Sequence, residues 1–284
     1  MTVSQWRTFP YEATDYDYSH EELAEHWSVL HAGDREPFPA PDWIKVLFKD
    51  IPRVAEEAGC DAQAATQQLL TGWGHFHRGD FAAAADIGES LGLVGATLWA
   101  KAQATYAHYL ETDKSVQRNL LMEVSDRMEA MAKAMPGTPN AYYHRAFALG
   151  RYSQVISVAE AWKQGVAGHV KNSLEAVLDR EPDHADAHTA LGTYHAEIID
   201  KMGAMFGGVT YGANRDEGVA HYQRGIELAP HSISALTEYA DGLLMMYGKK
   251  KVSQATELYE RAVSLDPYDA LSHLDWVLAK EELS

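Results

Sequence analysis

The stretch that decides the fold spans residues 234–267 and reads SALTEYADGLLMMYGKKKVSQATELYERAVSLDP. Its first half carries a small residue, Ala240, within an apolar helical pattern. Its second half carries two small residues seven positions apart, Ala255 and Ala262, before a Leu-Asp-Pro sequence ends at Pro267. Seven residues are close to two helical turns, so both alanines share a face that another helix can approach closely. Because proline cannot continue a helix, the stretch predicts two packed helices followed by a turn.

The same order of small residues recurs upstream of this stretch. One copy has Gly192 in its first helix, and Gly218 and Gly225, again seven apart, in its second. The other copies are one with Gly72, the turn Gly79-Asp80-Phe81, Ala84 and Leu91, and two looser ones at residues 99–136 and 142–182. No run of alternating β-branched residues is long enough to predict a strand. The repetition indicates an all-α array of similar helix pairs.

This pattern resembles the tetratricopeptide repeat (TPR), a helix–turn–helix unit of about 34 residues. The resemblance covers residues 62–281 and implies a right-handed helical-repeat array of four to five units. The prolines that close the units, Pro136, Pro182, Pro230 and Pro267, are 46, 48 and 37 residues apart. Two units are therefore expected to carry insertions. TPR arrays serve mainly as binding scaffolds, so the resemblance implies a partner and does not identify it.

Two blocks of sequence carry a closer resemblance. Residues 150–157 (GRYSQVIS) and residues 194–212 are similar to a set of bacterial TPR proteins of unassigned role. That set is similar in turn to the TPR component associated with TRAP transporters and to regulators of microtubule dynamics. The transporter component is an extracytoplasmic lipoprotein, and this sequence begins without a signal or a lipid-modifiable cysteine.

The N-terminal segment differs from the repeats in composition. Residues 1–61 hold 13 acidic and 5 basic residues and many aromatic ones. We expect an extended arm and then two helices, the first capped by Ser19 with Glu22 and the second beginning at Pro41. The predicted domains are an acidic aromatic arm with capping helices at residues 1–61 and the TPR-like domain at residues 62–284.

Charge and cysteine content exclude several classes of function. The chain has 41 acidic and 24 basic residues and a net charge of −17, which opposes binding to nucleic acid or to anionic lipid. The single cysteine, Cys60, cannot form an internal disulfide and suits a reducing compartment. No apolar run is long enough to span a membrane. We therefore expect a cytoplasmic protein with no nucleic-acid or membrane partner.

One stretch matches the sequence of a nucleophile motif but is not expected to have the secondary structure that the motif requires. Residues 88–92 read GESLG, which matches the G-x-S-x-G elbow of hydrolases with Ser90 as nucleophile. The elbow needs a strand before the serine, whereas an alanine-rich helical pattern precedes this one. Ser90 would need a nearby histidine and acid to act as a nucleophile. We therefore expect no enzymatic activity.

Three histidines form a stripe on one predicted helix. His184, His188 and His195 lie within 40° of one another, so their imidazoles could hold a metal ion. The alternative is packing, because His188 and His195 occupy positions where a TPR helix places large aromatic side chains. We favour packing and expect no metal and no cofactor.

The insertion at residues 198–214 is the most unusual stretch. It holds thirteen consecutive uncharged residues, four of them glycine, and is either a buried irregular filler or the wall of a binding site. The first helix of its unit should run through Glu197, Asp200 and Lys201 and project over the groove. The predicted ligand- or peptide-binding residues are Tyr143, Arg151, His195, Glu197, Asp200, Lys201, Phe206 and Tyr211.

The leading function is a non-enzymatic scaffold that binds a protein or peptide in the concave groove, with self-association also possible. The alternative is a small-molecule or metal-binding TPR protein that uses the insertion and the neighbouring histidines. A groove with buried polar groups and no cavity favours the scaffold. An enclosed pocket lined by Tyr143, His195, Glu197 and Tyr211 favours the alternative.

Overall fold

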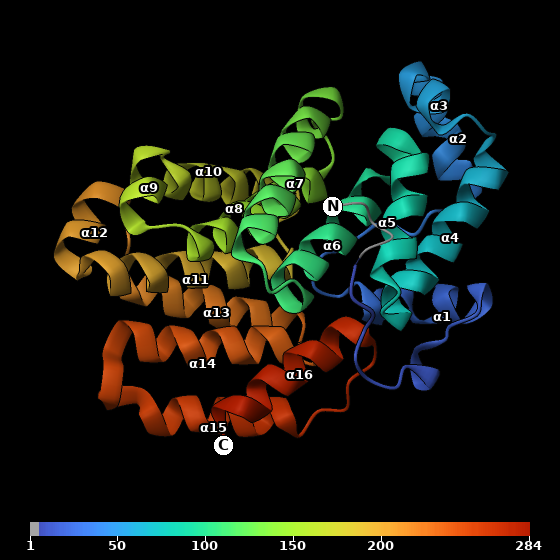
Figure 1. Ribbon diagram of the computed structural model, residues 1–284. Helices are drawn as coiled ribbons and strands as arrows, with labels where there is room; N and C mark the ends of the chain where they lie inside the picture. The colour runs from blue at the N-terminus through green and yellow to red at the C-terminus, as the bar shows by residue number, and fades with distance from the viewer. Residues whose placement is uncertain (1–5) are drawn as a thin grey trace. The chain divides into compact units, whose positions relative to one another are not determined.

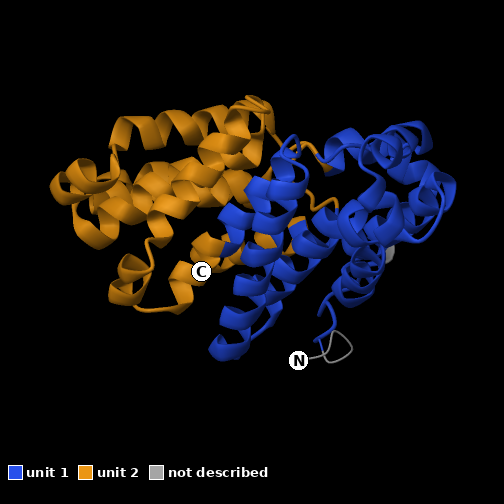
Figure 2. Cartoon of the chain, turned by 90° about the horizontal axis from the view of Figure 1, so that it is seen from above, with its two compact units in different colours: residues 1–30, 36–148, 269–271 blue, residues 31–35, 149–268, 272–284 orange. Residues whose placement is uncertain are grey.

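The structure is a computed structural model that describes residues 6–284, except for the side chain of Thr14. In this part of the chain every regular element is a helix (Figure 1). The chain forms two compact units (Figure 2). Unit 1 consists of residues 1–30, 36–148 and 269–271, and unit 2 of residues 31–35, 149–268 and 272–284. The division at residue 61 that the sequence suggests remains a prediction about domains.

Unit 1 contains the N-terminal helices and the first repeats. Its elements are η2 (Thr14–Tyr16), α1 (His20–Leu30), α2 (Pro41–Asp50), α3 (Pro52–Ala58), α4 (Ala62–Arg78), α5 (Phe81–Ser90), η3 (Gly92–Gly95), α6 (Ala96–Thr105), the π-helical turn η4 (Tyr106–Leu110), α7 (Lys114–Ala134) and the first part of α8 (Pro139–Val155). Helix α4 packs on α5, and α6 on both α5 and α7. These two helix pairs are the first two repeats.

The N-terminal helices follow their predicted signals with one correction. The capping box is present: the Ser19 backbone N–H donates to Glu22 Oε2 at 2.8 Å, and the Glu22 backbone N–H donates to Ser19 Oγ at 3.2 Å. The expectation of two helices is wrong, because α2 ends at Asp50 and α3 begins separately at Pro52. Proline has no N–H to donate within a helix, so it starts the new one.

The turn between α4 and α5 needs glycine, as the sequence predicts. Gly79 ends α4 with a positive φ of 90°, and a Cβ there would lie 2.7 Å from the Phe9 ring. Two residues earlier, His77 is fully buried, and its Nδ1 lies 2.8 Å from Asp269 Oδ2. The small segment 269–271 therefore completes the core of unit 1 from the far end of the chain.

Unit 2 contains the later repeats and the last helix. Its elements are the rest of α8, α9 (Val158–Lys163), α10 (Val166–Leu178), α11 (Ala185–Met202), α12 (Ala204–Tyr211), α13 (Arg215–Leu228), α14 (Ile233–Tyr247), η5 (Gly248–Lys251), α15 (Val252–Val263) and α16 (Ala270–Glu282). Helix α11 packs on α13, and α14 packs on α15, as two repeats. The looser copy predicted at residues 142–182 covers α8, α9 and α10. The inserted helices α9 and α12 stand where the long proline spacings predict extra residues.

The small residues make the close helix contacts that the repeat requires. Ala240, Ala255 and Ala262 expose at most 1% of their surface. A Cβ on Gly192 would lie 2.7 Å from the Tyr222 ring, which is itself fully buried. The predicted register of the last two repeats is therefore confirmed. None of the described helices is long and apolar enough to cross a membrane.

The insertion after α11 differs from the buried irregular filler that is one of its two predicted forms. As predicted, α11 runs through Lys201 and ends at Met202, where Gly203 with a φ of 79° breaks it. The following residues form the short helix α12, in which Met205 is 85% exposed. The expectation of a buried irregular segment is wrong, because Gly207 is the only buried residue of this helix.

Candidate functional site

A polar strip runs across the first helices of the three repeats in unit 2. It consists of Arg151 and Gln154 on α8, Thr193, Glu197 and Lys201 on α11, and Glu238 on α14. These side chains form direct bonds from helix to helix and stay partly exposed. Helices of successive repeats thus bring together residues that are up to 87 positions apart in the sequence.

The centre of the polar strip is an ion pair between α8 and α14. Arg151 Nη2 donates to Glu238 Oε1 at 2.6 Å, and the two side chains expose 17% and 18% of their surface. The Thr193 hydroxyl donates to Glu238 Oε2 at 2.8 Å and accepts from the Tyr222 hydroxyl at 3.0 Å. Burial opposes ionisation of Glu238, but Arg151 and Thr193 outweigh it and hold its pKa below the usual value. Glu238 is therefore a carboxylate at neutral pH.

One turn further along α14, Asp241 lies in a different electrostatic setting. It accepts a short hydrogen bond from the Tyr259 hydroxyl of α15. Burial, together with the charges of Glu238 and Glu282, raises the pKa of Asp241 to about 6. Two carboxylates on one helix thus have opposite pKa shifts, because only Glu238 bonds directly to Arg151.

The other end of the polar strip centres on Glu197. Gln154 Nε2 donates to Glu197 Oε1 at 2.7 Å, and Lys201 Nζ donates to Glu197 Oε2 at 2.8 Å. The Glu197 and Lys201 side chains expose 16% and 31% of their surface. Asp200 is exposed beside them on α11. Three of the predicted residues, Arg151, Glu197 and Lys201, thus lie in the polar strip.

His195 lies on another face of α11, against α13. It is 3% exposed, and its Nδ1 accepts from the backbone N–H of Asn214 at 3.1 Å. Its ring stacks on His221 with centroids 6.0 Å apart. Burial lowers the pKa of His195 and of His221 to about 4, so both rings are neutral at physiological pH. The His195 ring therefore packs between its neighbours, as the packing interpretation of the histidine stripe predicts.

The other two histidines of the stripe are also held by protein groups. His184 caps α11, accepting the Ala187 N–H at Nδ1. His188 Nε2 lies 3.0 Å from the Pro182 carbonyl, which can only accept, so the neutral ring carries its proton there. His188 Nδ1 therefore accepts from His221 Nδ1, 3.0 Å away. Within residues 6–284 no three His, Cys, Asp or Glu side chains are arranged to hold a metal ion.

The three predicted aromatic residues are spread over two units. Tyr143 belongs to unit 1, where its ring lies 6.3 Å from that of Phe147. Phe206 is 49% exposed on α12 in unit 2. Tyr211 ends α12, and its carbonyl accepts from the Tyr194 hydroxyl at 3.0 Å. Within unit 2 these contacts place Phe206 and Tyr211 on the inserted helix, outside the bonds of the polar strip.

Ser90 does not have the setting of a nucleophile elbow. It is the last residue of α5, so a helix precedes it where the elbow requires a strand. Its Oγ donates to the Ile87 carbonyl at 2.8 Å, within its own helix. Gly88 of the same motif packs against the backbone of Trp99, as a helix contact does.

A shallow open pocket of about 300 Å³ lies elsewhere in unit 2, between α13, α14 and α15. Lys251 lies over the Tyr247 ring at 5.8 Å and also bonds Gln254, so this wall combines an aromatic face with a cation. Its volume is at the lower end of the range for small-molecule sites. None of the predicted site residues lines it.

Sequence reasoning missed the partners that complete these sites. Glu238 and Asp241 have a signal in the sequence, because they are carboxylates three positions apart in an otherwise uncharged helix. Gln154, Thr193 and His221 have none, because each gains its role only from a side chain on another helix.

Comparisons with known proteins bear on the fold of this protein. No model of a known protein family matches the chain, and no curated protein matches it. Among solved structures, it is similar to the crystal structure of a thermophilic TPR protein from Thermus thermophilus. The TM-score is 0.55 and the identity 16%, over 76% of this chain and 99% of that chain. At this identity the likeness shows the fold alone, and the fold of this protein is a TPR-like helical-repeat array.

Proposed function

We propose that this protein is a non-enzymatic scaffold whose unit 2 binds an extended peptide segment of another protein along the polar strip. The observation that carries the proposal is that α8, α11 and α14 contribute polar groups to one connected set of bonds. Its two halves are joined on α8, where Arg151 Nη1 donates to Gln154 Oε1 at 3.5 Å. In TPR arrays the first helices line the inner surface. A peptide there would meet carboxylate, ammonium, guanidinium and amide groups in sequence.

The chemistry of the polar strip suits a peptide. A peptide backbone offers regularly spaced donors and acceptors, and Gln154 and Glu197 can exchange their mutual bond for bonds to it. Glu197 stays bonded during the exchange, because Lys201 Nζ still donates to its Oε2. Tyr211 at the end of α12 supplies an aromatic ring against which a side chain of the peptide can pack.

The remaining parts of the proposal rest on composition and resemblance. The single cysteine, Cys60, suits a reducing cytoplasm. The helical setting of Ser90 argues against hydrolysis. We also propose that the chain is related to TPR proteins linked with TRAP transporters or microtubules, because residues 150–157 and 194–212 resemble them. This relatedness does not identify a binding partner.

The test begins with peptides selected from a phage-displayed random library on the immobilised wild-type protein. Their affinities are then measured by fluorescence anisotropy with Glu197→Ala, Tyr211→Ala and wild type. Loss of the charge-assisted bond in Glu197→Ala, or of the aromatic surface in Tyr211→Ala, should weaken binding at least about tenfold. The melting temperature should stay nearly unchanged, because Glu197 bonds only partly exposed groups.

A matched control is Arg224→Ala on α13, which removes an exposed ion pair with Asp183 outside the polar strip. Arg224→Ala should bind the selected peptides as the wild type does. If Glu197→Ala and Tyr211→Ala lower the melting temperature while their folded fraction binds normally, the insertion and the polar strip are structural and the proposal is wrong.

A further inference from the structure

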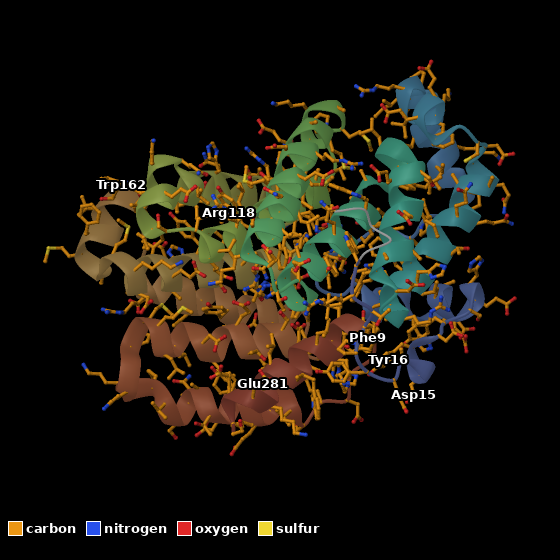
Figure 3. The ribbon with its side chains drawn as sticks, viewed as in Figure 1. Phe9, Asp15, Tyr16, Arg118, Trp162 and Glu281 are labelled. Atoms are coloured by element: carbon orange, nitrogen blue, oxygen red, sulfur yellow. The ribbon has the colours of Figure 1, made fainter. Side chains whose placement is uncertain are left out.

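Two short inserted helices give unit 2 an exposed apolar surface. It consists of Val158 and Trp162 on α9 and Met205, Phe206 and Val209 on α12, and we name these five residues the apolar end. Trp162 is 62% exposed, Met205 85% and Val209 87%. Figure 1 draws both helices at one end of unit 2, and Figure 3 shows Trp162 there. A Cβ on Gly212, which follows α12, would lie 3.2 Å from Lys171 of α10, the helix after α9.

The orientation of α12 explains why its apolar side chains face outward. Gly207 turns inward, where a Cβ would lie 2.8 Å from Ile198 of α11. Met205 and Val209 are one turn apart on the opposite face. A helix that is apolar all round is normally buried, yet the eight residues of α12 include no charge, and four of them, Met205, Phe206, Val209 and Thr210, are exposed. Exposed apolar surfaces of this kind mark interaction sites.

We propose that the apolar end is an isologous interface through which two copies of this chain form a dimer. Each copy carries a net charge of −17, so most of their surfaces repel each other. Residues 202–213 are uncharged, and α9 carries one charge of each sign, Glu160 and Lys163, so this surface lacks the excess of acidic groups found over the whole chain. Trp and Met are also residue types enriched at the centres of protein interfaces.

The area is sufficient for a dimer. From their exposed fractions, the five side chains of the apolar end offer roughly 600 Å² per copy. Two copies would then bury about 1,200 Å², above the ~1,000 Å² expected of a specific interface. In a two-fold dimer the same surface meets itself, so one substitution alters both sides of the contact.

The test is sedimentation velocity of the full chain across the micromolar range, with wild type, Val209→Glu and Val252→Glu. The wild type should sediment as a dimer, and Val209→Glu should weaken the dimer at least about tenfold, because two new carboxylates face each other. Val252→Glu is the matched control, an exposed valine (48%) on α15 outside the apolar end. It should leave the dimer intact. Added salt should strengthen the wild-type dimer, because it screens the repulsion.

A wild type that stays monomeric throughout, or a dimer that Val209→Glu leaves unchanged, overturns the proposal. Vesicles of phosphatidylcholine supply a further arm. If the wild type is monomeric and binds the vesicles, and Val209→Glu abolishes that binding, the apolar end is a lipid-binding surface and the dimer proposal is wrong. Binding of the selected peptides to the polar strip should be unaffected by Val209→Glu, so this proposal and the peptide proposal fail separately.

Discussion

Replacing Arg151 by alanine tests how strongly unit 2 depends on the central ion pair of the polar strip. Arg151 and Glu238 are 2.6 Å apart and expose less than a fifth of their side-chain surface. Removing one partner of a fully buried pair costs about 3–5 kcal/mol, because the remaining charge stays buried. Glu238 keeps some solvent access and its bond from Thr193, so we expect a loss of about 1–3 kcal/mol near pH 7.

The loss should shrink in acid. In the wild type, Arg151 overcomes the effect of burial and holds the pKa of Glu238 below 4.5, so the stabilisation is present above that value and disappears as the pH falls through the folded-state pKa. In Arg151→Ala, burial acts without that cation and raises the pKa of Glu238. The variant then takes up a proton on folding and gains stability as the pH falls. The difference in free energy of unfolding between the wild type and Arg151→Ala should therefore become smaller from about pH 7 to about pH 4.5.

The assay is urea denaturation followed by far-UV circular dichroism at both pH values. Arg224→Ala serves as the control, because its ion pair with Asp183 is about half exposed and should contribute little. An Arg151→Ala protein as stable as the wild type near neutral pH would refute the reasoning. A gap that stays constant or widens in acid would refute the assignment of the effect to Glu238.

Three further predictions concern other buried residues of unit 2. Asp241→Asn should raise the melting temperature above the pKa of about 6 and change it little below, because the buried carboxylate destabilises the fold only when ionised; thermal scans at two pH values check this. The ring signals of His195 and His221 in NMR spectra should titrate near pH 4, and stability should fall as the pH drops from about 6.5 toward that value; midpoints near 6.5 would contradict their burial. Ala262→Leu should cost about 1–3 kcal/mol by overpacking a fully buried contact, whereas Ala220→Leu, at an exposed position of α13, should melt like the wild type.

The sequence predicts the repeats well because their packing rule is local. Small residues seven apart and a closing proline repeat in the chain, and Ala255, Ala262 and Gly192 are buried where that rule requires. The break at Pro52 follows from the same local chemistry, since a proline cannot continue a helix. The exposure of α12 does not follow from the sequence, because an uncharged, glycine-rich segment has the same composition whether a neighbour covers it or not.

The candidate site is predictable only in part, for a physical reason. Glu197 and Lys201 are four residues apart on one helix, so their contact follows from helical geometry. The bond from Arg151 to Glu238 joins residues 87 positions apart and depends on the packing of α8 near α14. The sequence pattern assigns His195 both to the binding site and to the packing stripe, and its contacts with Asn214 and His221 show the second role.

The buried bond between His77 and Asp269 makes unit 1 dependent on a residue that is translated long after most of its core. The two residues are 192 positions apart, yet they share one core. At about 5–20 residues per second, about 10–40 s pass between the synthesis of the histidine and that of its carboxylate. During that interval the imidazole of the growing polypeptide lacks this hydrogen-bond partner. Ribosome-bound chains that stop short of Asp269 should therefore be more sensitive to protease around α4 than the released protein.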